Sequence, residues 1–357
     1  MSRSEEIEIK VKKRKPKKAS GKAGRIIFRI ALSVITLLLL IVAGLYATLY
    51  VVFKGPSPST RDMAVATMLE ASATKWIPRL YFSEDEIKEM IRSNGVQEVD
   101  DVTDPSLVEI KLPDPGDDPT ADDEWADAED GILIKNEKSD YYRGYVMLIR
   151  DPSRVFVGVS SNFRSGAPGL KIFEAIEKYN AVAAINAGGF PDTGGMGKGD
   201  VPLGLTISEG QLLWGSEYQS FKGVIGFTED NVLVVGNMTG KQALEKGVRD
   251  CVCFGPLLIV NGEPMTISGD AGSRNPRTAI GQRADGTVIF VVVDGRMASS
   301  LGASYYDLIN IMLKYGAVNA ANLDGGSSAH MYYKGEPLNV SSSLYGPRRM
   351  PTFFMVR

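Results

Sequence analysis

The sequence predicts an α+β fold: a strand-rich, mixed-sheet domain with a few helices, preceded by a single transmembrane helix and a stalk. Three observations predict it. Residues 30–53 form an uncharged apolar run, residues 98–130 are acidic and contain several prolines, and beyond Gly131 short β-branched runs alternate with glycine and turn residues. The 357 residues, 44% hydrophobic and 23% charged, suffice for one large domain or two modest ones.

The apolar run 30–53 is long enough to cross a membrane. At about 1.5 Å per residue, such a helix spans a hydrocarbon core of about 30 Å with some tilt. A buried helix of a soluble protein is one alternative, but an uncharged run of this length argues against it. A cleaved signal peptide is another, because small residues lie between Ala43 and Ala47, although the apolar region is longer than usual. We expect an uncleaved anchor.

Basic residues cluster in 1–29, ahead of the apolar run. Lys and Arg beside a span resist translocation, so the sequence predicts a basic cytoplasmic tail and a cell-membrane protein whose C-terminal domain is extracellular. Because the basic residues from Lys10 to Arg25 have no aromatic residues among them and precede the span, they favour contact with anionic lipid and argue against nucleic acid as a partner.

Residues 54–130 are expected to form a stalk and an acidic linker. Ser59 or the threonine after it can cap a helix, and Ser83 with Glu86 forms a capping-box pattern ahead of a second short helix. The acidic stretch has few large apolar residues to bury, which is typical of a solvated linker.

Residues 131–357 carry the strand and helix patterns of one domain of ordinary size. Two amphipathic segments, 169–179 and 305–315, predict helices, and hairpin-type turns are expected at 208–211 and 260–263. The β-branched runs that predict strands are 144–149, 155–159, 181–186, 203–208, 232–235, 257–260, 287–294 and 353–356.

Several kinds of chemistry lack support in the sequence. Cys251 and Cys253 are too few for a disulfide scaffold, and we expect two free or packed thiols. His330 is the only histidine, and neither a Gly-x-Ser-x-Gly motif nor a nucleotide-binding glycine loop is present, which argues against a nucleophilic triad and nucleotide chemistry. The sequence indicates no metal site and leaves any cofactor unknown.

Four glycine-rich loops at strand ends carry the residues best suited to chemistry. Asn186 ends an apolar run, and its amide both donates and accepts hydrogen bonds. Arg277 offers a planar fork of donors that fits two phosphate oxygens. Asp294 and Asp324 each follow apolar residues and precede glycine, where a carboxylate can exchange a proton. Each loop, taken alone, also fits a plain turn.

Six motifs, taken in order, resemble the phosphodiester glycosidase family, and the resemblance covers residues 131–357. The chain departs from the family's commoner pattern at Ala187 and Ser327. The motifs are the Asn186 loop, Pro202-Leu203-Gly204-Leu205, Gly255-Pro256-Leu257-Leu258, Arg277-Thr278-Ala279-Ile280-Gly281, Asp294-Gly295-Arg296, and Asn322-Leu323-Asp324-Gly325-Gly326-Ser327-Ser328.

The resemblance implies hydrolysis of a sugar 1-phosphodiester, a reaction that needs acid/base help at the anomeric carbon and cations or N–H donors at the phosphate. On this basis Asp324 and Asp294 are the expected acid/base carboxylates, Arg277 the phosphate clamp, and Asn186 a hydrogen-bonding group for sugar or phosphate. Further residues expected to bind the carbohydrate phosphodiester substrate are Gly188, Gly189, Phe190, Arg296, Asn322, Gly325, Gly326, Ser327 and Ser328.

A non-catalytic module that binds or assembles cell-surface polysaccharide is the alternative function. Such a module would bind glycans without turning them over. The enzyme is favoured because carboxylates and phosphate-type donors recur on the glycine loops.

Overall fold

The computed structural model describes residues 21–70, 74–97, 99–112, 123–192, 197–269, 273–343 and 345–357. The chain divides into two compact units, Met1–Pro56 and Ser57–Arg357. Most of the predicted basic tail precedes Gly21, and part of the acidic stretch falls in residues 113–122; both lie outside the described residues.

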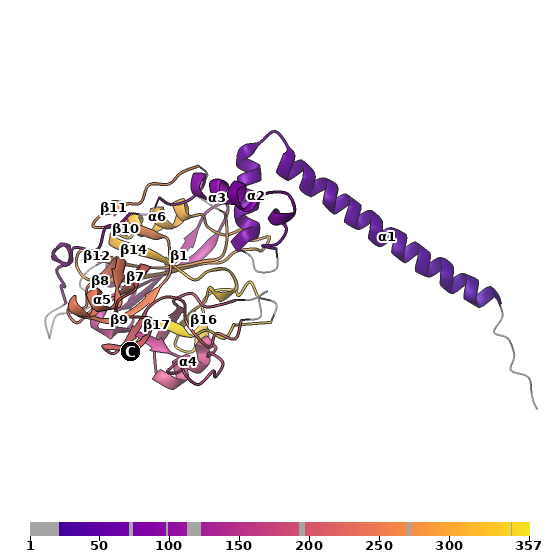
Figure 1. Cartoon of the computed structure of the whole chain (residues 1–357). Helices are drawn as coiled ribbons and strands as arrows, with labels where there is room; N and C mark the ends of the chain where they lie inside the picture. The colour runs from indigo at the N-terminus through magenta and orange to yellow at the C-terminus, as the bar shows by residue number, and fades with distance from the viewer. Residues whose placement is uncertain are drawn as a thin grey trace, which may run out of the picture. The chain divides into compact units, whose positions relative to one another are not determined.

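The first unit contains helix α1, Gly21–Lys54, which includes the whole predicted span 30–53 (Figure 1). Its segment Gly24–Lys54 is long and apolar enough to cross a membrane. Apolar side chains such as those of Leu39 and Leu40 are exposed along it, as on a helix that faces lipid. A signal sequence near an N-terminus would meet the same criteria of length and composition.

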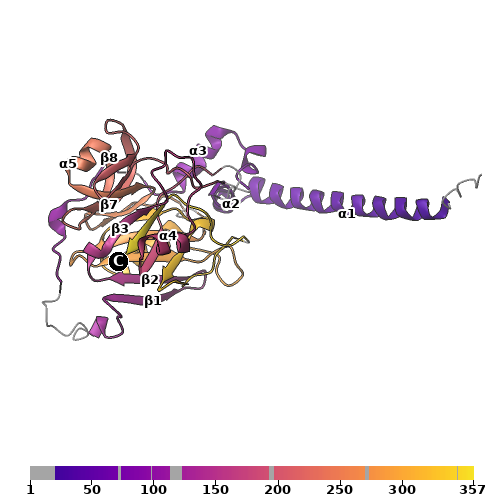
Figure 2. The same ribbon diagram turned by 90° about the horizontal axis from the view of Figure 1, so that it is seen from below.

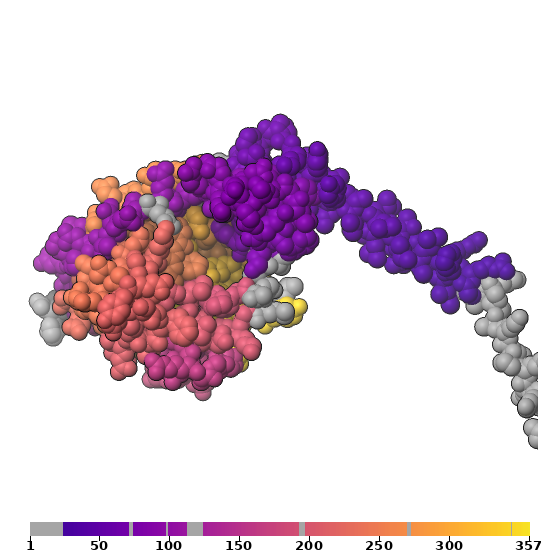
Figure 3. All heavy atoms as spheres, in the orientation of Figure 1, coloured from indigo at the N-terminus to yellow at the C-terminus, as the bar shows by residue number. Residues whose placement is uncertain are grey.

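Two helices open the second unit, α2 (Pro58–Glu70) and α3 (Glu84–Ser93). The predicted capping box of α3 is confirmed, because the Ser83 hydroxyl accepts from the backbone of Glu86 and the Glu86 carboxylate accepts from the backbone of Ser83. Figure 3 shows the purple atoms of this helical segment lying against the surface of the domain.

The chain after α3 runs along the strand domain. The Thr103 hydroxyl accepts a hydrogen bond from Val235 N at 2.9 Å, and Glu109 N donates to Ala284 O at 2.8 Å. The described part of the predicted acidic linker is therefore packed on the domain by hydrogen bonds that its composition did not reveal. The unit boundary falls after Pro56, near the start of the predicted stalk and linker at residues 54–130.

The strands form three sheets (Figures 1 and 2), and among the described residues every strand pair is antiparallel, where the sequence led us to expect mixed sheets. The first sheet, in spatial order, consists of β1 (Ile132–Lys138), β2 (Arg143–Ile149), β13 (Val288–Val293), β12 (Arg277–Arg283), β14 (Ala317–Leu323), β10 (Leu257–Val260) and β11 (Glu263–Pro264). The second consists of β16 (Glu336–Pro337), β15 (Met331–Tyr333), β4 (Ala183–Asn186), β17 (Thr352–Val356) and β3 (Val155–Val159). The third consists of β6 (Gln211–Trp214), β5 (Thr206–Ser208), β9 (Val248–Cys253), β7 (Ser220–Thr228) and β8 (Leu233–Thr239).

A central core lies among the three sheets, and helices cover their outer faces. The alternation along β3 illustrates this, because Val155 and Val157 belong to the central core whereas Phe156 packs in a second cluster with residues of α4. Among the residues that the structure describes, the strand domain contains three α-helices. Helix α4 (Ile172–Tyr179) covers the second sheet, α5 (Gly240–Glu245) packs on β8 and β9, and α6 (Tyr305–Lys314) packs on β10 and β14.

The strand-rich α+β fold predicted from the sequence is confirmed. The two predicted helices become α4 and α6, and both predicted hairpin turns join antiparallel strands, β5 to β6 and β10 to β11. Cys251 and Cys253 are free and buried on β9, as expected, and burial raises the pKa of the Cys253 thiol to about 11.

Candidate active site

The register of the first sheet brings three of the predicted motifs to one edge. Arg277, the first residue of β12, lies opposite Val293, the last residue of β13, so the Asp294 loop begins beside it. On the other side of β12, Thr278 lies opposite Leu323, so the Asp324 loop begins there. In an antiparallel sheet the start of one strand meets the ends of its neighbours, which explains why these motifs converge.

A cavity of about 230 Å³ lies at this edge. Of the residues predicted from the sequence, Arg277, Arg296, Asp324, Gly325 and Gly326 line it together. Its remaining lining residues come from the end of α2, from the segment after β9 and from the start of α6: Glu70, Phe254, Gly255 and Tyr305.

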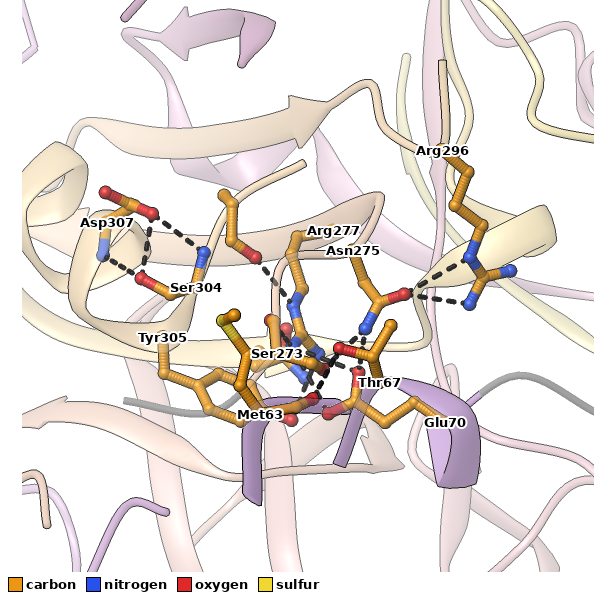
Figure 4. Close-up of polar contacts among 12 residues, drawn as sticks. Met63, Thr67, Glu70, Ser273, Asn275, Arg277, Arg296, Ser304, Tyr305 and Asp307 are labelled. Atoms are coloured by element: carbon orange, nitrogen blue, oxygen red, sulfur yellow. Dashed lines mark hydrogen bonds and ion pairs between the residues drawn. The ribbon is translucent and has the colours of Figure 1, made fainter. Parts of the chain in front are cut away.

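The guanidinium group of Arg277 is held on several sides (Figure 4). Its side chain is only 5% exposed, Nη1 donates to the hydroxyl of Tyr305 at 3.0 Å, and Nη2 donates to Ser273 O at 2.8 Å. Nη2 also forms an ion pair with the Glu70 carboxylate at 3.0 Å. Arg277 is therefore preorganised for an anion, and in the structure the anion is a side chain of α2.

Asn275 connects Arg296 with the same carboxylate (Figure 4). Its Oδ1 accepts from Arg296 Nε at 3.2 Å and Nη2 at 2.9 Å, while its Nδ2 donates to Glu70 Oε2 at 2.6 Å. A Cβ atom at Gly326 would lie 3.3 Å from Arg296 Nη1, so glycine lets the guanidinium lie close to the Asp324 loop. Burial lowers the pKa of Arg296, the negative charge of Glu70 acts in the opposite direction, and the positive charge of Arg277 lowers it.

Asp324 is the acidic residue of this cavity that follows β14. Its backbone N–H donates to Ala187 O at 3.0 Å, which fixes it against the loop after β4. Burial raises the pKa of the Asp324 carboxyl to about 6, while a hydrogen bond from the Ser328 hydroxyl and the charge of Arg348 act in the opposite direction. A carboxyl group with this pKa exchanges protons readily near neutral pH, which suits general acid/base chemistry.

Asn186 contacts the backbone of Asp324 and is fully buried. Its Nδ2 donates to the backbone carbonyl of Asp324 at 2.5 Å, and its Oδ1 accepts from the Thr278 hydroxyl at 2.8 Å and from His330 N at 3.1 Å. The Asn186 amide is thus bonded to protein groups, and these contacts are those of a residue that fixes the Asp324 loop.

Asp294, the second predicted acid/base residue, lines a different cavity of about 430 Å³, together with Glu137 and Arg143. Its carboxylate accepts from Asn339 Nδ2 at 3.2 Å and from Val340 N at 2.9 Å, and burial raises the pKa of its carboxyl group. The structure does not bring Asp294 into the cavity that Asp324 lines.

The other predicted binding residues do not line this cavity but pack beside the residues that do. A Cβ at Gly188 or Gly189 would approach within 3.0 Å of β9 or the residue after it, so close packing requires glycine at both positions. Asn322 is buried and donates to Gly255 O at 2.7 Å. Phe190 is buried beneath the guanidinium of Arg348, whose carbon lies 5.0 Å from the ring centroid. Ser328 is buried, while Ser327 faces Arg348 at 3.4 Å.

Four residues with polar or charged side chains that the structure places at or beside the cavity had been assigned no role from the sequence. They carry no motif of their own: Glu70 ends a short helix, Tyr305 begins a predicted one, and Arg348 lies in a loop near the C-terminus. Asn275 stands in the predicted Arg277 loop, and its place two residues before that arginine was a usable signal.

A solved structure of similar fold agrees with this architecture. The catalytic domain of zebrafish N-acetylglucosamine-1-phosphodiester alpha-N-acetylglucosaminidase, described as auto-inhibited by its pro-peptide, has a similar fold, with a TM-score of 0.54 at 22% identity over 63% of this chain and 82% of that one. A putative exported protein from Burkholderia pseudomallei aligns with a TM-score of 0.43 at 18% identity, covering 60% of this chain and 74% of that one.

Among curated proteins, the SPbeta prophage-derived uncharacterized protein YomE of Bacillus subtilis is 32% identical over 177 residues, which is 47% of this chain and 27% of that protein. The chain therefore spans about a quarter of the length of this relative. The family model for phosphodiester glycosidases matches residues 179–357, the half of the chain that contains Asn186, Arg277, Arg296 and Asp324. By this match the chain belongs to the phosphodiester glycosidase family.

Proposed function

We propose that the chain is a membrane-anchored, extracytoplasmic hydrolase that cleaves the glycosidic bond of a sugar 1-phosphodiester. One observation carries the proposal: a carboxyl group with a pKa of about 6, Asp324, shares a small cavity with two guanidinium groups, those of Arg277 and Arg296. This combination places a proton-exchanging group beside donors for an anion.

The chemistry of the bond explains how these groups would act. Water attacks the anomeric carbon, the bond from that carbon to the phosphate oxygen breaks, and a phosphomonoester leaves with one more negative charge than it carried in the diester. Arg277 and Arg296 would stabilise this charge as it develops. Asp324, in its ionised form, would accept a proton from the attacking water. A phosphate leaving group needs little protonation, so a single acid/base carboxylate, that of Asp324, suffices.

The position of the enzyme is part of the proposal. Helix α1 would act as an uncleaved anchor, with residues 1–29 as the cytoplasmic tail and residues 131–357 as the outer catalytic domain. The apolar length of α1 and the basic residues that precede its apolar part support this orientation. The substrate would then be a sugar phosphodiester at the cell surface, for example in a phosphate-linked polysaccharide.

A turnover assay tests both the proposed activity and the proposed position outside the membrane. Intact cells that produce the full chain are incubated with a panel of glycosyl phosphodiesters, and released sugar is measured before and after permeabilisation. We expect release without permeabilisation and none from cells that produce Asp324→Asn. Glycan binding without turnover by the wild-type protein would instead support a non-catalytic binding or assembly module.

The contacts of Glu70 add a regulatory element to the proposal. Its carboxylate lies where the phosphate of a substrate would meet Arg277, and it comes from α2, which precedes the strand domain in the chain. The zebrafish domain of similar fold is described as auto-inhibited by its pro-peptide. We propose that α2 blocks the anion site in a comparable way and must withdraw before a substrate binds.

Replacing Glu70 with Gln is expected to raise kcat/KM about tenfold, because a hydrogen bond to a charged group contributes about 1.5–3 kcal/mol and its loss frees the binding-competent state. Steady-state kinetics on full-length protein in detergent measure the effect. Glu84→Gln is the matched control, since Glu84 pairs with Arg79 on the exposed surface of the same segment. Loss of turnover in Glu70→Gln would contradict the block and identify Glu70 as a second catalytic carboxylate.

A further inference from the structure

Arg348 lies beside the candidate active site without lining its cavity. Its Nη1 forms an ion pair with Asp192 Oδ2 at 2.8 Å, and its guanidinium stacks over Phe190 at 5.0 Å from the ring centroid. Both partners belong to the chain that follows β4. The Arg348 side chain is 14% exposed, so the ion pair is largely shielded from water.

The same guanidinium reaches the Asp324 loop. Nη1 lies 3.4 Å from the Ser327 hydroxyl, and the next residue, Ser328, hydrogen-bonds the Asp324 carboxyl group. Within the part of the chain that the structure describes, Nη2 of Arg348 is buried and has no hydrogen-bond partner. Leaving a buried donor unpaired costs free energy, so such a donor at a candidate site calls for a functional explanation.

We propose that Arg348 is a positioning residue for Asp324, and that Asp192 and Phe190 hold its guanidinium in place for this task. Arg348 contacts both the loop after β4, through Asp192, and the turn after β14, through Ser327. It also places a positive charge near the Asp324 carboxyl group. The proposal rests on the proposed function, because it assigns Arg348 to the reaction that Asp324 would perform.

The charges around Asp324 set the direction of the expected effect. Arg348 lowers the pKa of the Asp324 carboxyl and Asp192 raises it, while burial is the largest influence and raises it. The other charged or titratable residues that line the cavity with Asp324 are Arg277, Arg296, Glu70 and Tyr305. These cavity groups remain in every variant of Arg348, so a change in the titration of Asp324 reports on Arg348.

The first test is the pH profile of kcat/KM for Arg348→Met in full-length protein. An ionised Asp324 is needed to accept a proton, so the rate falls as pH drops through its pKa. Removal of the nearby cation raises that pKa, and we expect the acidic limb to move to higher pH by about one unit. Arg348→Lys keeps the charge and is expected to keep the position of the limb, with a lower rate because the fork of donors is lost.

Arg349→Met is the matched control, because Arg349 is the neighbouring residue but pairs with Glu174 at 2.8 Å. We expect its limb to coincide with that of the wild type. A limb that stays in place in Arg348→Met, with only a lower unfolding temperature, would overturn the proposal and leave Arg348 a structural residue.

A second measurement is independent of turnover. The carboxyl carbon of Asp324 is followed by ¹³C NMR over a pH titration of the full-length protein, and its signal is assigned by its absence in Asp324→Asn. A higher midpoint in Arg348→Met supports the positioning role even if no glycosyl phosphodiester is hydrolysed, in which case the proposed function alone fails. An unchanged midpoint refutes the positioning role whatever the activity.

Discussion

Turnover of a glycosyl phosphodiester is expected to fall about 10²–10⁴-fold when Asp324 is replaced by Asn, the range that general acid/base catalysis contributes. Asn has nearly the same shape and can still accept from the Ser328 hydroxyl, but it cannot exchange a proton. The fold should survive, because burial raises the pKa of the Asp324 carboxyl above its ordinary value and its ionised form is therefore disfavoured in the native state. Kinetics and thermal unfolding of the same preparations measure both effects.

The sign of the pH dependence follows from the same shift. The native state holds the Asp324 proton more tightly than the unfolded chain does, so this group makes the protein less stable as pH rises from about 4 to 6. Asp324→Asn removes that dependence, and its unfolding temperature at neutral pH should equal or exceed that of the wild type. A variant that is unfolded at neutral pH would contradict this account of Asp324.

Asp294→Asn tests whether both of the aspartates proposed from the sequence take part in acid/base chemistry. Asp294 lines another cavity and accepts from Asn339 and Val340, so the structure gives it contacts that hold a loop in place. If Asp294→Asn and Asp324→Asn lose turnover to the same degree with their folds intact, the prediction that Asp294 takes part in acid/base chemistry stands. Its position at a separate cavity would then not exclude Asp294 from the reaction.

The sequence predicted the fold well where local patterns determine structure. The capping box at Ser83, the amphipathic helices α4 and α6 and the turn between β10 and β11 depend on neighbouring residues and were found. Strands β7, β9 and β14 were not predicted as separate strands, because glycine, charged or asparagine residues interrupt their apolar pattern. These segments form strands because they pair with strands distant in the sequence and are buried on both faces. A short stretch of sequence does not contain that information.

The candidate site was predictable in part for a related reason. Arg277 begins β12, while Arg296 and Asp324 stand beside glycine after the two neighbouring strands, and the register of β12 then brings them together. Glu70 lies 207 residues before Arg277 in the chain, and Arg348 lies in the segment ahead of the last strand. Nothing in the local sequence of either residue indicates that it belongs to the site. Asp294 and Asp324 both follow apolar residues and precede glycine, but they line different cavities.

Arg277→Lys is expected to lower kcat/KM about 10²-fold, because the loss of one preorganised donor to a developing anion typically has an effect of this size. Lysine keeps the charge but cannot reproduce the fork that contacts Tyr305, Ser273 and the anion together. The loss should be greater for kcat than for KM if the added negative charge arises in the transition state. Steady-state kinetics with a phosphodiester and with a neutral aryl glycoside of the same sugar measure it, and the neutral substrate should be much less affected.

Arg283→Lys provides the matched control for stability, because Arg283 ends the strand that Arg277 begins. It also makes an ion pair, with Glu124 at 2.7 Å, and its side chain is 14% exposed against 5% for Arg277. Both variants should therefore unfold at lower temperature, while only Arg277→Lys should lose turnover. If both lose turnover in proportion to their loss of stability, Arg277 supports the fold of β12 and another group must bind the phosphate. If Arg277→Lys alone loses turnover and does so equally for both substrates, Arg277 positions the sugar or Asp324 rather than the phosphate.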